Sequence, residues 1–237
     1  MMQMKYCRMV LFYFLIAVLM TGNAKEKEDD NMLPLDDLKN KTNTTVIIGA
    51  SYARAWSIES IQGKTVINKG VDGNQSFEML ARFKEDVLDQ NPDTVIIWGF
   101  INDIFRSDSG NMENTLSRIK NSYEEMCKLA IKKGINTILA TEVTIREPSG
   151  FSNQVSGLIG SLLGKKSYQD YINGHVIEMN KWLKQFARSK QLSILDFEKV
   201  LSGAGRSRKA EYATDDGSHI AEAAYDRLSA YVVEEME

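Results

Sequence analysis

Five short apolar runs, separated by segments of helical length, most restrict how this chain can fold. The runs are rich in β-branched residues and occupy residues 45–51, 65–73, 93–103, 136–144 and 192–197. Continuous apolar runs of this length are typical of strands buried on both faces, as in a parallel sheet. Apolar residues recur at helical spacing in residues 77–87, 111–133, 168–186 and 220–232. The alternation predicts a three-layer α/β/α sandwich around a five-stranded, mostly parallel sheet.

The first 24 residues differ from the rest of the chain. Lys5 and Arg8 precede an apolar run at residues 9–20, and the small residues Gly22 and Ala24 then precede a charged segment. This order is typical of a secretory signal peptide cleaved after Ala24, because a membrane-spanning helix needs roughly 20 apolar residues. We therefore expect residues 1–24 to be a signal peptide and the mature protein to be secreted or periplasmic, without stable membrane insertion. An uncleaved membrane anchor is the alternative.

The remaining composition points to one domain that works without a metal. Residues 25–42 are polar and charged and are expected to form a lead-in to a catalytic domain over residues 43–237. The net charge of −3 gives no support to a nucleic-acid partner. Cys127 is the single cysteine after the leader and falls on the apolar face of an expected helix, so we interpret it as a buried structural thiol. We expect no metal and no organic cofactor.

Polar residues and glycines follow the expected strands, where parallel sheets form ligand sites. Ser51 ends the first run, Gly73 follows the second and Asn102 follows the third. Near the C-terminus, Asp216 precedes His219 by three residues. Each block alone has an ordinary structural interpretation: Ser51 as a helix N-cap, Gly73 as part of a tight turn, Asn102 as a turn residue and Asp216 as the N-cap of the last helix.

Together, these blocks supply the groups that acyl transfer requires. A serine at a strand-to-helix turn exposes its hydroxyl, and its backbone N–H can stabilise a developing oxyanion. An acid three residues before a histidine can reach one ring nitrogen and leave the other for the serine hydroxyl. A nucleophile, a base, an orienting acid and oxyanion donors make a complete set for acyl transfer.

In this order and spacing, the four blocks resemble the SGNH (GDSL-type) hydrolases, and the resemblance runs from about Thr45 to the end of the chain. It implies a flavodoxin-like fold and a serine esterase that cleaves an ester or thioester in a small-molecule or glycan substrate. The matching positions make Ser51 the nucleophile, His219 the general base and Asp216 the residue that orients the imidazole. The oxyanion hole would comprise the backbone N–H groups of Ser51 and Gly73 and the side-chain amide of Asn102.

Three positions depart from the family pattern. Ala50 stands where the family usually has aspartate, and Ile220 follows the histidine where proline is frequent. The asparagine block reads G-x-x-N-D, one residue longer than usual, which weakens the match at Gly99 but not at Asn102. None of these departures removes a group that transfers a proton or stabilises an oxyanion.

The sequence is compatible with several interpretations. The same residues would serve a carbohydrate O-acyltransferase, and the fold would also suit a non-catalytic binding module or a flavodoxin-like nucleotide binder. The apolar segment at residues 147–166 could form a lid or acyl pocket, or a core-packing helix. The basic segment at residues 202–209 could meet an anionic or sugar substrate, although a solvated loop is favoured. His175 lies on the apolar stripe of an expected helix, which favours a core or rim position.

Overall fold

The computed structural model describes residues 42–146 and 167–236. The expected signal peptide, nearly all of the lead-in and the apolar segment 147–166 lie outside these residues. The strands are β1 (Thr44–Gly49), β2 (Ser60–Ile61), β3 (Lys64–Gly70), β4 (Thr94–Trp98), β5 (Asn136–Ala140) and β6 (Ser193–Leu195). The α-helices are α3 (Ser51–Ala55), α4 (Ser76–Asp86), α5 (Ile101–Phe105), α6 (Met112–Lys132), α8 (Tyr168–Lys190), α9 (Phe197–Leu201) and α10 (Glu222–Met236).

The described strands form one sheet in the order β2-β3-β1-β4-β5-β6. The five expected strands are all present and pair in parallel, in the flavodoxin-like order. The prediction of five strands was nevertheless wrong by one, because β2 adds an antiparallel edge to β3. A turn at Gln62 and Gly63, both with positive φ, joins β2 to β3. A strand of two residues has no periodicity, so the sequence pattern could not reveal it.

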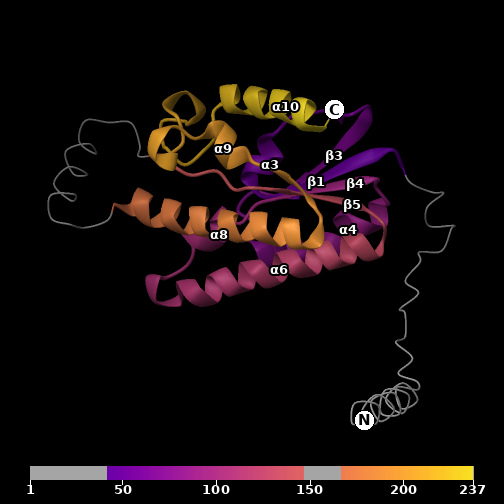
Figure 1. Cartoon of the computed structure of the whole chain (residues 1–237), viewed down its shortest axis with the longest axis horizontal. Coiled ribbons are helices and arrows are strands. Elements are labelled where there is room, and N and C mark those ends of the chain that lie inside the picture. The colour runs from indigo at the N-terminus through magenta and orange to yellow at the C-terminus, as the bar shows by residue number, and fades with distance from the viewer. Residues whose placement is uncertain (1–41, 147–166, 237) are drawn as a thin grey trace, which may run out of the picture. The chain divides into compact units, whose positions relative to one another are not determined.

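Helices cover both faces of the sheet, as the sequence predicted (Figure 1). The helices α4, α6 and α8 lie on one face, and α3, α9 and α10 lie on the other (Figure 1). The central strands β1 and β4 are buried almost throughout, whereas β3 is mostly half-buried. The expectation of burial on both faces was therefore wrong for β3, which lies next to the edge strand β2 rather than at the centre of the sheet.

Two side chains singled out in the sequence lie where the apolar patterns placed them. Cys127 is buried in α6, and burial raises the pKa of its thiol to about 12. His175 lies on α8 with a quarter of its side chain exposed, and its ring packs edge-to-face on Tyr171 at 4.8 Å between centroids. Both positions fit structural roles.

Within residues 42–146 and 167–236, no helix is both long and apolar enough to be a membrane span.

The chain between Asp216 and the last helix folds differently from expectation. The helix α10 begins at Glu222, so Asp216 is not its N-cap. Gly217 has a φ of 74°, which interrupts any helix at this point, and Ala213 pairs with Ile220 in an antiparallel bridge. Asp216 and His219 therefore lie together in a tight turn that precedes α10.

Gly49, the last residue of β1, allows α3 to begin directly above the sheet. A Cβ atom at this position would lie 2.2 Å from the carbonyl oxygen of Trp98 and 2.4 Å from the Cβ atom of Ala53. Real Cβ contacts are not this short, and the Trp98 oxygen belongs to the backbone of the neighbouring strand and cannot rotate away. The turn between β1 and α3 therefore requires glycine.

Replacing Gly49 with alanine is expected to lower the free energy of unfolding by about 1–3 kcal/mol, the range for overpacking a buried site. Gly174→Ala is the matched control, because Gly174 lies within α8 and a Cβ atom there would meet nothing within 4 Å apart from the backbone of its own helix. That control is expected to stabilise the protein by about 0.5–1 kcal/mol through helix propensity. Urea unfolding of both variants measures the difference, and equal stability for Gly49→Ala and the wild type would contradict the close approach.

Candidate active site

A pocket of about 520 Å³ lies beyond the carboxyl ends of the central strands. Four of the five site residues predicted from the sequence line this pocket: Ser51, Gly73, Asn102 and His219. The fifth, Asp216, lies behind His219 and contacts its ring. The pocket is completed by Tyr52, Ala55, Asp72, Ile220 and Tyr225. Segments far apart in the sequence thus meet at one edge of the sheet, as expected for an open parallel sheet.

Ser51 is the first residue of α3 and stands immediately after the turn at the end of β1. The N-cap of α3 is Ala50, which makes no side-chain capping bond, so the alternative interpretation of Ser51 as an N-cap is wrong. The first N–H groups of a helix have no partner within the helix. The N–H of Ser51 can therefore serve a ligand in the pocket.

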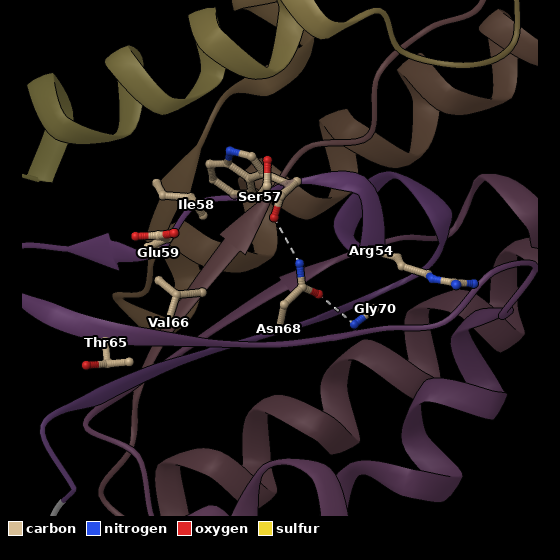
Figure 2. Close-up of a pocket in the computed structure, with 9 residues that line it drawn as sticks. Arg54, Ser57, Ile58, Glu59, Thr65, Val66, Asn68 and Gly70 are labelled. Carbon is tan, nitrogen blue, oxygen red and sulfur yellow. Dashed lines mark hydrogen bonds between the residues drawn. The ribbon is translucent and has the colours of Figure 1, made fainter.

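The far end of α3 is held by Asn68 on β3. Figure 2 shows the Asn68 side chain between this helix end and its own strand: Nδ2 donates to the carbonyl oxygen of Trp56 at 3.0 Å, and Oδ1 accepts from the N–H of Gly70 at 2.9 Å. Nδ2 also donates to the carbonyl oxygen of Ala53 at 2.7 Å. A helix of five residues is not stable alone, so these bonds help to fix the direction in which Ser51 points.

A second pocket surrounds Asn68 and, at about 660 Å³, is larger than the first. Figure 2 shows its lining, which includes Arg54, Ser57, Glu59 and Thr65. It contains a serine but no histidine. The smaller pocket is therefore the candidate active site on chemical grounds, despite its size.

Gly73 lies in a turn that faces the nucleophile. It has a φ of 74°, and Asn74 donates its N–H to the carbonyl oxygen of Val71 at 3.2 Å. A Cβ atom at Gly73 would lie 2.7 Å from a guanidinium nitrogen of Arg106. Glycine is favoured here because of the left-handed backbone, whereas the exposed Arg106 side chain could move aside for a Cβ atom.

Asn102 lies in the first turn of α5, and its side chain is held from the neighbouring turn. Its Nδ2 donates to the carbonyl oxygen of Asn74 at 3.0 Å. An amide nitrogen carries two hydrogens, so one remains to face the pocket. This bond also ties the Asn102 side chain to the turn that contains Gly73.

Two buried acids that the sequence analysis overlooked hold α5 in place. Glu142, just after β5, accepts the N–H groups of Phe100 at 3.0 Å and Ile101 at 3.3 Å, at the start of α5. Asp103 accepts the N–H of Ser76 at 2.7 Å and its hydroxyl at 2.8 Å, at the start of α4. Burial raises the pKa of both carboxyl groups, and these donors oppose the rise. In the sequence, each of the two acids lies within an apolar run, and a charged residue in such a run indicates a buried, hydrogen-bonded carboxyl group.

The Asp216–His219 turn has the geometry that the spacing predicted. Oδ2 of Asp216 lies 2.6 Å from Nδ1 of His219, and Oδ1 accepts the N–H groups of Ser218 at 2.7 Å and His219 at 2.9 Å. Although partial burial opposes ionisation, the hydrogen bonds from His219 and Ser218 hold the pKa of the Asp216 carboxyl below its usual range. An ionised carboxylate on Nδ1 keeps the Nδ1–H tautomer and leaves Nε2 as the acceptor.

The arrangement suits acyl transfer. It brings a hydroxyl, an imidazole oriented by a carboxylate, two backbone N–H groups and a side-chain amide to one pocket. In the described part of the chain, no three histidine, cysteine, aspartate or glutamate side chains cluster as metal ligands would.

Comparison with known proteins yields one family. Residues 44–227 match the model of the GDSL-like Lipase/Acylhydrolase family. An acetylxylan esterase from Geobacillus stearothermophilus is 48% identical over 44 residues, which are 19% of this chain and 20% of that protein. The matched part thus spans about a fifth of this curated relative.

Solved structures share the fold at low sequence identity. The crystal structure of a GDSL-like lipase from Bacteroides thetaiotaomicron has a TM-score of 0.62 at 18% identity, over 85% of this chain and 95% of that one. The crystal structure of an acetylxylan esterase from Geobacillus stearothermophilus has a TM-score of 0.61 at 18% identity, over 83% and 95%. Because the family match contains every described strand and every residue that lines the pocket, the chain belongs to the GDSL-like lipase/acylhydrolase family.

Proposed function

We propose that this protein is a serine hydrolase that cleaves an ester bond through an acyl-enzyme. The observation that carries the proposal is the meeting of Ser51, Gly73, Asn102 and His219 in one pocket, with Asp216 bonded to Nδ1 of the histidine. Membership of a family of lipases and acylhydrolases supports the same activity.

In the proposed mechanism, Oγ of Ser51 attacks the acyl carbon while Nε2 of His219 accepts the hydroxyl proton. The carbonyl oxygen becomes an oxyanion, which accepts hydrogen bonds from the N–H groups of Ser51 and Gly73 and from the Asn102 amide. Collapse of this intermediate breaks the ester bond, and His219 returns the proton to the departing alcohol. His219 then takes a proton from water, which attacks the acyl-enzyme, and returns this proton to Oγ of Ser51 as the acid departs.

We infer that the substrate is a carboxylic ester, with an O-acyl group on a carbohydrate as the favoured class. The acetylxylan esterases among the relatives and solved structures support a sugar ester. The pocket also combines polar groups with the apolar surface of Ile220 and Tyr225. We propose that the protein acts in the periplasm or outside the cell, on the basis of the leader at residues 1–24. The alternative activity, with the same residues, is that of an acyltransferase that passes the acyl group to a sugar hydroxyl.

Replacing Ser51 with alanine is expected to remove both turnover of p-nitrophenyl esters and labelling by a fluorophosphonate, because the attacking oxygen is lost. The loss in kcat should reach about 10⁴-fold or more, as when a triad member is removed. Ser57→Ala is the matched control, because Ser57 is an exposed serine of the second pocket, and it should retain full activity. The assay uses residues 25–237 with acyl chains from acetyl to long-chain.

The results separate the proposed activities. Equal activity in the wild type and Ser51→Ala would overturn the role of Ser51. A wild type that neither hydrolyses nor labels would favour the non-catalytic binding module. Acyl transfer to a sugar that outcompetes hydrolysis in the same assay would favour the acyltransferase.

Asp216→Asn is expected to lower kcat by about 10³–10⁴-fold, because an amide at this position favours the wrong imidazole tautomer. KM should change little, since Asp216 does not line the pocket. Asp215→Asn is the matched control at the neighbouring acid and should remain within about threefold of the wild type in kcat/KM. Comparable losses in both variants would indicate a general effect of charge rather than orientation of His219.

A further inference from the structure

A buried arginine lies behind the proposed catalytic residues. Arg208 belongs to the basic segment at residues 202–209, for which a solvated loop was the favoured interpretation. That interpretation was wrong for this residue, because Arg208 is only 1% exposed. Burying a guanidinium is costly unless its hydrogen-bonding groups find partners, so the contacts of Arg208 indicate what the burial achieves.

The guanidinium of Arg208 joins three separate segments of the chain. Its Nε donates to the carbonyl oxygen of Thr144 at 2.8 Å, and its Nη1 donates to the carbonyl oxygen of His219 at 2.5 Å. Its Nη2 donates to the hydroxyl oxygen of Tyr52 at 3.2 Å, and the guanidinium carbon lies 5.4 Å from the centroid of the Tyr52 ring. Thr144 follows β5, whereas the other two partners belong to the active site.

Tyr52 closes the connection between the nucleophile and the base. It is the residue after Ser51 in α3, and its hydroxyl donates to the carbonyl oxygen of Ser218, next to His219. Burial raises the pKa of Tyr52 to about 12, so its hydroxyl remains a donor throughout the neutral range. Arg208 and Tyr52 thus bind both the helix that presents Ser51 and the turn that presents His219.

Arg208 forms no ion pair with any of the described residues. The neighbouring arginine, Arg206, instead pairs with the buried Glu198 at 2.6 Å. The positive charge of Arg208 opposes the rise that burial causes in the pKa of Glu142. Glu142 in turn holds the start of α5, which carries Asn102.

We propose that Arg208 is a positioning residue that fixes α3, which carries Ser51, relative to the turn that carries His219. The proposal rests on the proposed serine hydrolase mechanism. Ser51 and His219 lie on separate elements, and the turn that carries His219 belongs to no helix or strand. A displacement of about 1 Å between reacting groups can cost about 100-fold in rate. The guanidinium of arginine is planar and permanently charged, and its N–H donors point in fixed directions, so it is suited to preventing such a displacement.

The direct test compares Arg208→Ala with Arg206→Ala. Arg206 is the matched control because it lies on the same segment and makes a buried ion pair with Glu198, while neither its side chain nor Glu198 lines the pocket. Arg208→Ala is expected to lower kcat by about 100-fold with KM within about threefold, the pattern for loss of alignment in the transition state. Arg206→Ala should keep kcat within about threefold even if it lowers the melting temperature.

Chemical rescue separates positioning from a purely structural role. Guanidinium at millimolar concentration can occupy the space left by the deleted side chain and donate to the His219 carbonyl and the Tyr52 hydroxyl. It is expected to restore kcat of Arg208→Ala by about tenfold and to leave Arg206→Ala unchanged. A loss of kcat that matches the loss of folded protein by circular dichroism, without rescue, would overturn the proposal.

Tyr52→Phe provides the readout if Arg208→Ala does not fold. This variant keeps the ring in the core and removes only the hydroxyl that links Arg208 to Ser218. Its kcat and its rate of fluorophosphonate labelling are expected to fall by about tenfold. Because Ser218 and Arg208 each lose a buried hydrogen-bond partner, the melting temperature also falls, so both rates are measured well below it. Wild-type rates in Tyr52→Phe would overturn the proposal. An inactive wild type would instead contradict the proposed function, so the two failures are distinguishable.

Discussion

Parallel pairing on both sides of β1 is the constraint on which the site depends. Gly49, at the end of β1, lies opposite Gly70 on β3 and opposite Trp98 on β4. Parallel strands in register finish at the same edge, so the residues that follow each strand must emerge together. Ser51, Gly73 and Asn102 each follow one of these three ends within a few residues. Their convergence needs no further explanation than the register of the sheet.

Convergence alone does not give the precision that catalysis requires, and hydrogen bonds from polar side chains outside the pocket supply it. The helices α3 and α5, which carry Ser51 and Asn102, have five residues each and are too short to be stable alone. Asn68 holds the end of α3, and Glu142 holds the start of α5. Glu142 is fully buried, and a buried carboxyl group is costly when unpaired, so its hydrogen bonds favour one arrangement of the start of α5 over its alternatives. The rigidity of this site therefore comes from side chains that lie outside the pocket.

The departures from the family pattern at Ala50 and Ile220 affect the turns that carry the reacting groups rather than the reacting groups themselves. Ala50 is buried and caps α3 without a side-chain bond, so the close packing at Gly49 and the bonds of Asn68 hold this helix instead. Ile220 is 6% exposed and pairs across a bridge with Ala213, which closes the turn that carries Asp216 and His219. A buried isoleucine can fulfil this role because the turn is also tied by its own hydrogen bonds to Asp216.

The sequence by itself determined the elements with local signals. Apolar runs identified the five parallel strands, helical spacing identified α4, α6, α8 and α10, and the three-residue spacing identified the Asp216–His219 pair. The two-residue β2, the start of α10 at Glu222 and the burial of Arg208 were decided only by the tertiary structure. A two-residue strand exists only because a neighbour pairs with it, and a charged side chain is buried only where distant carbonyl and hydroxyl groups meet it. Such contacts join residues far apart in the chain, and no local pattern encodes them.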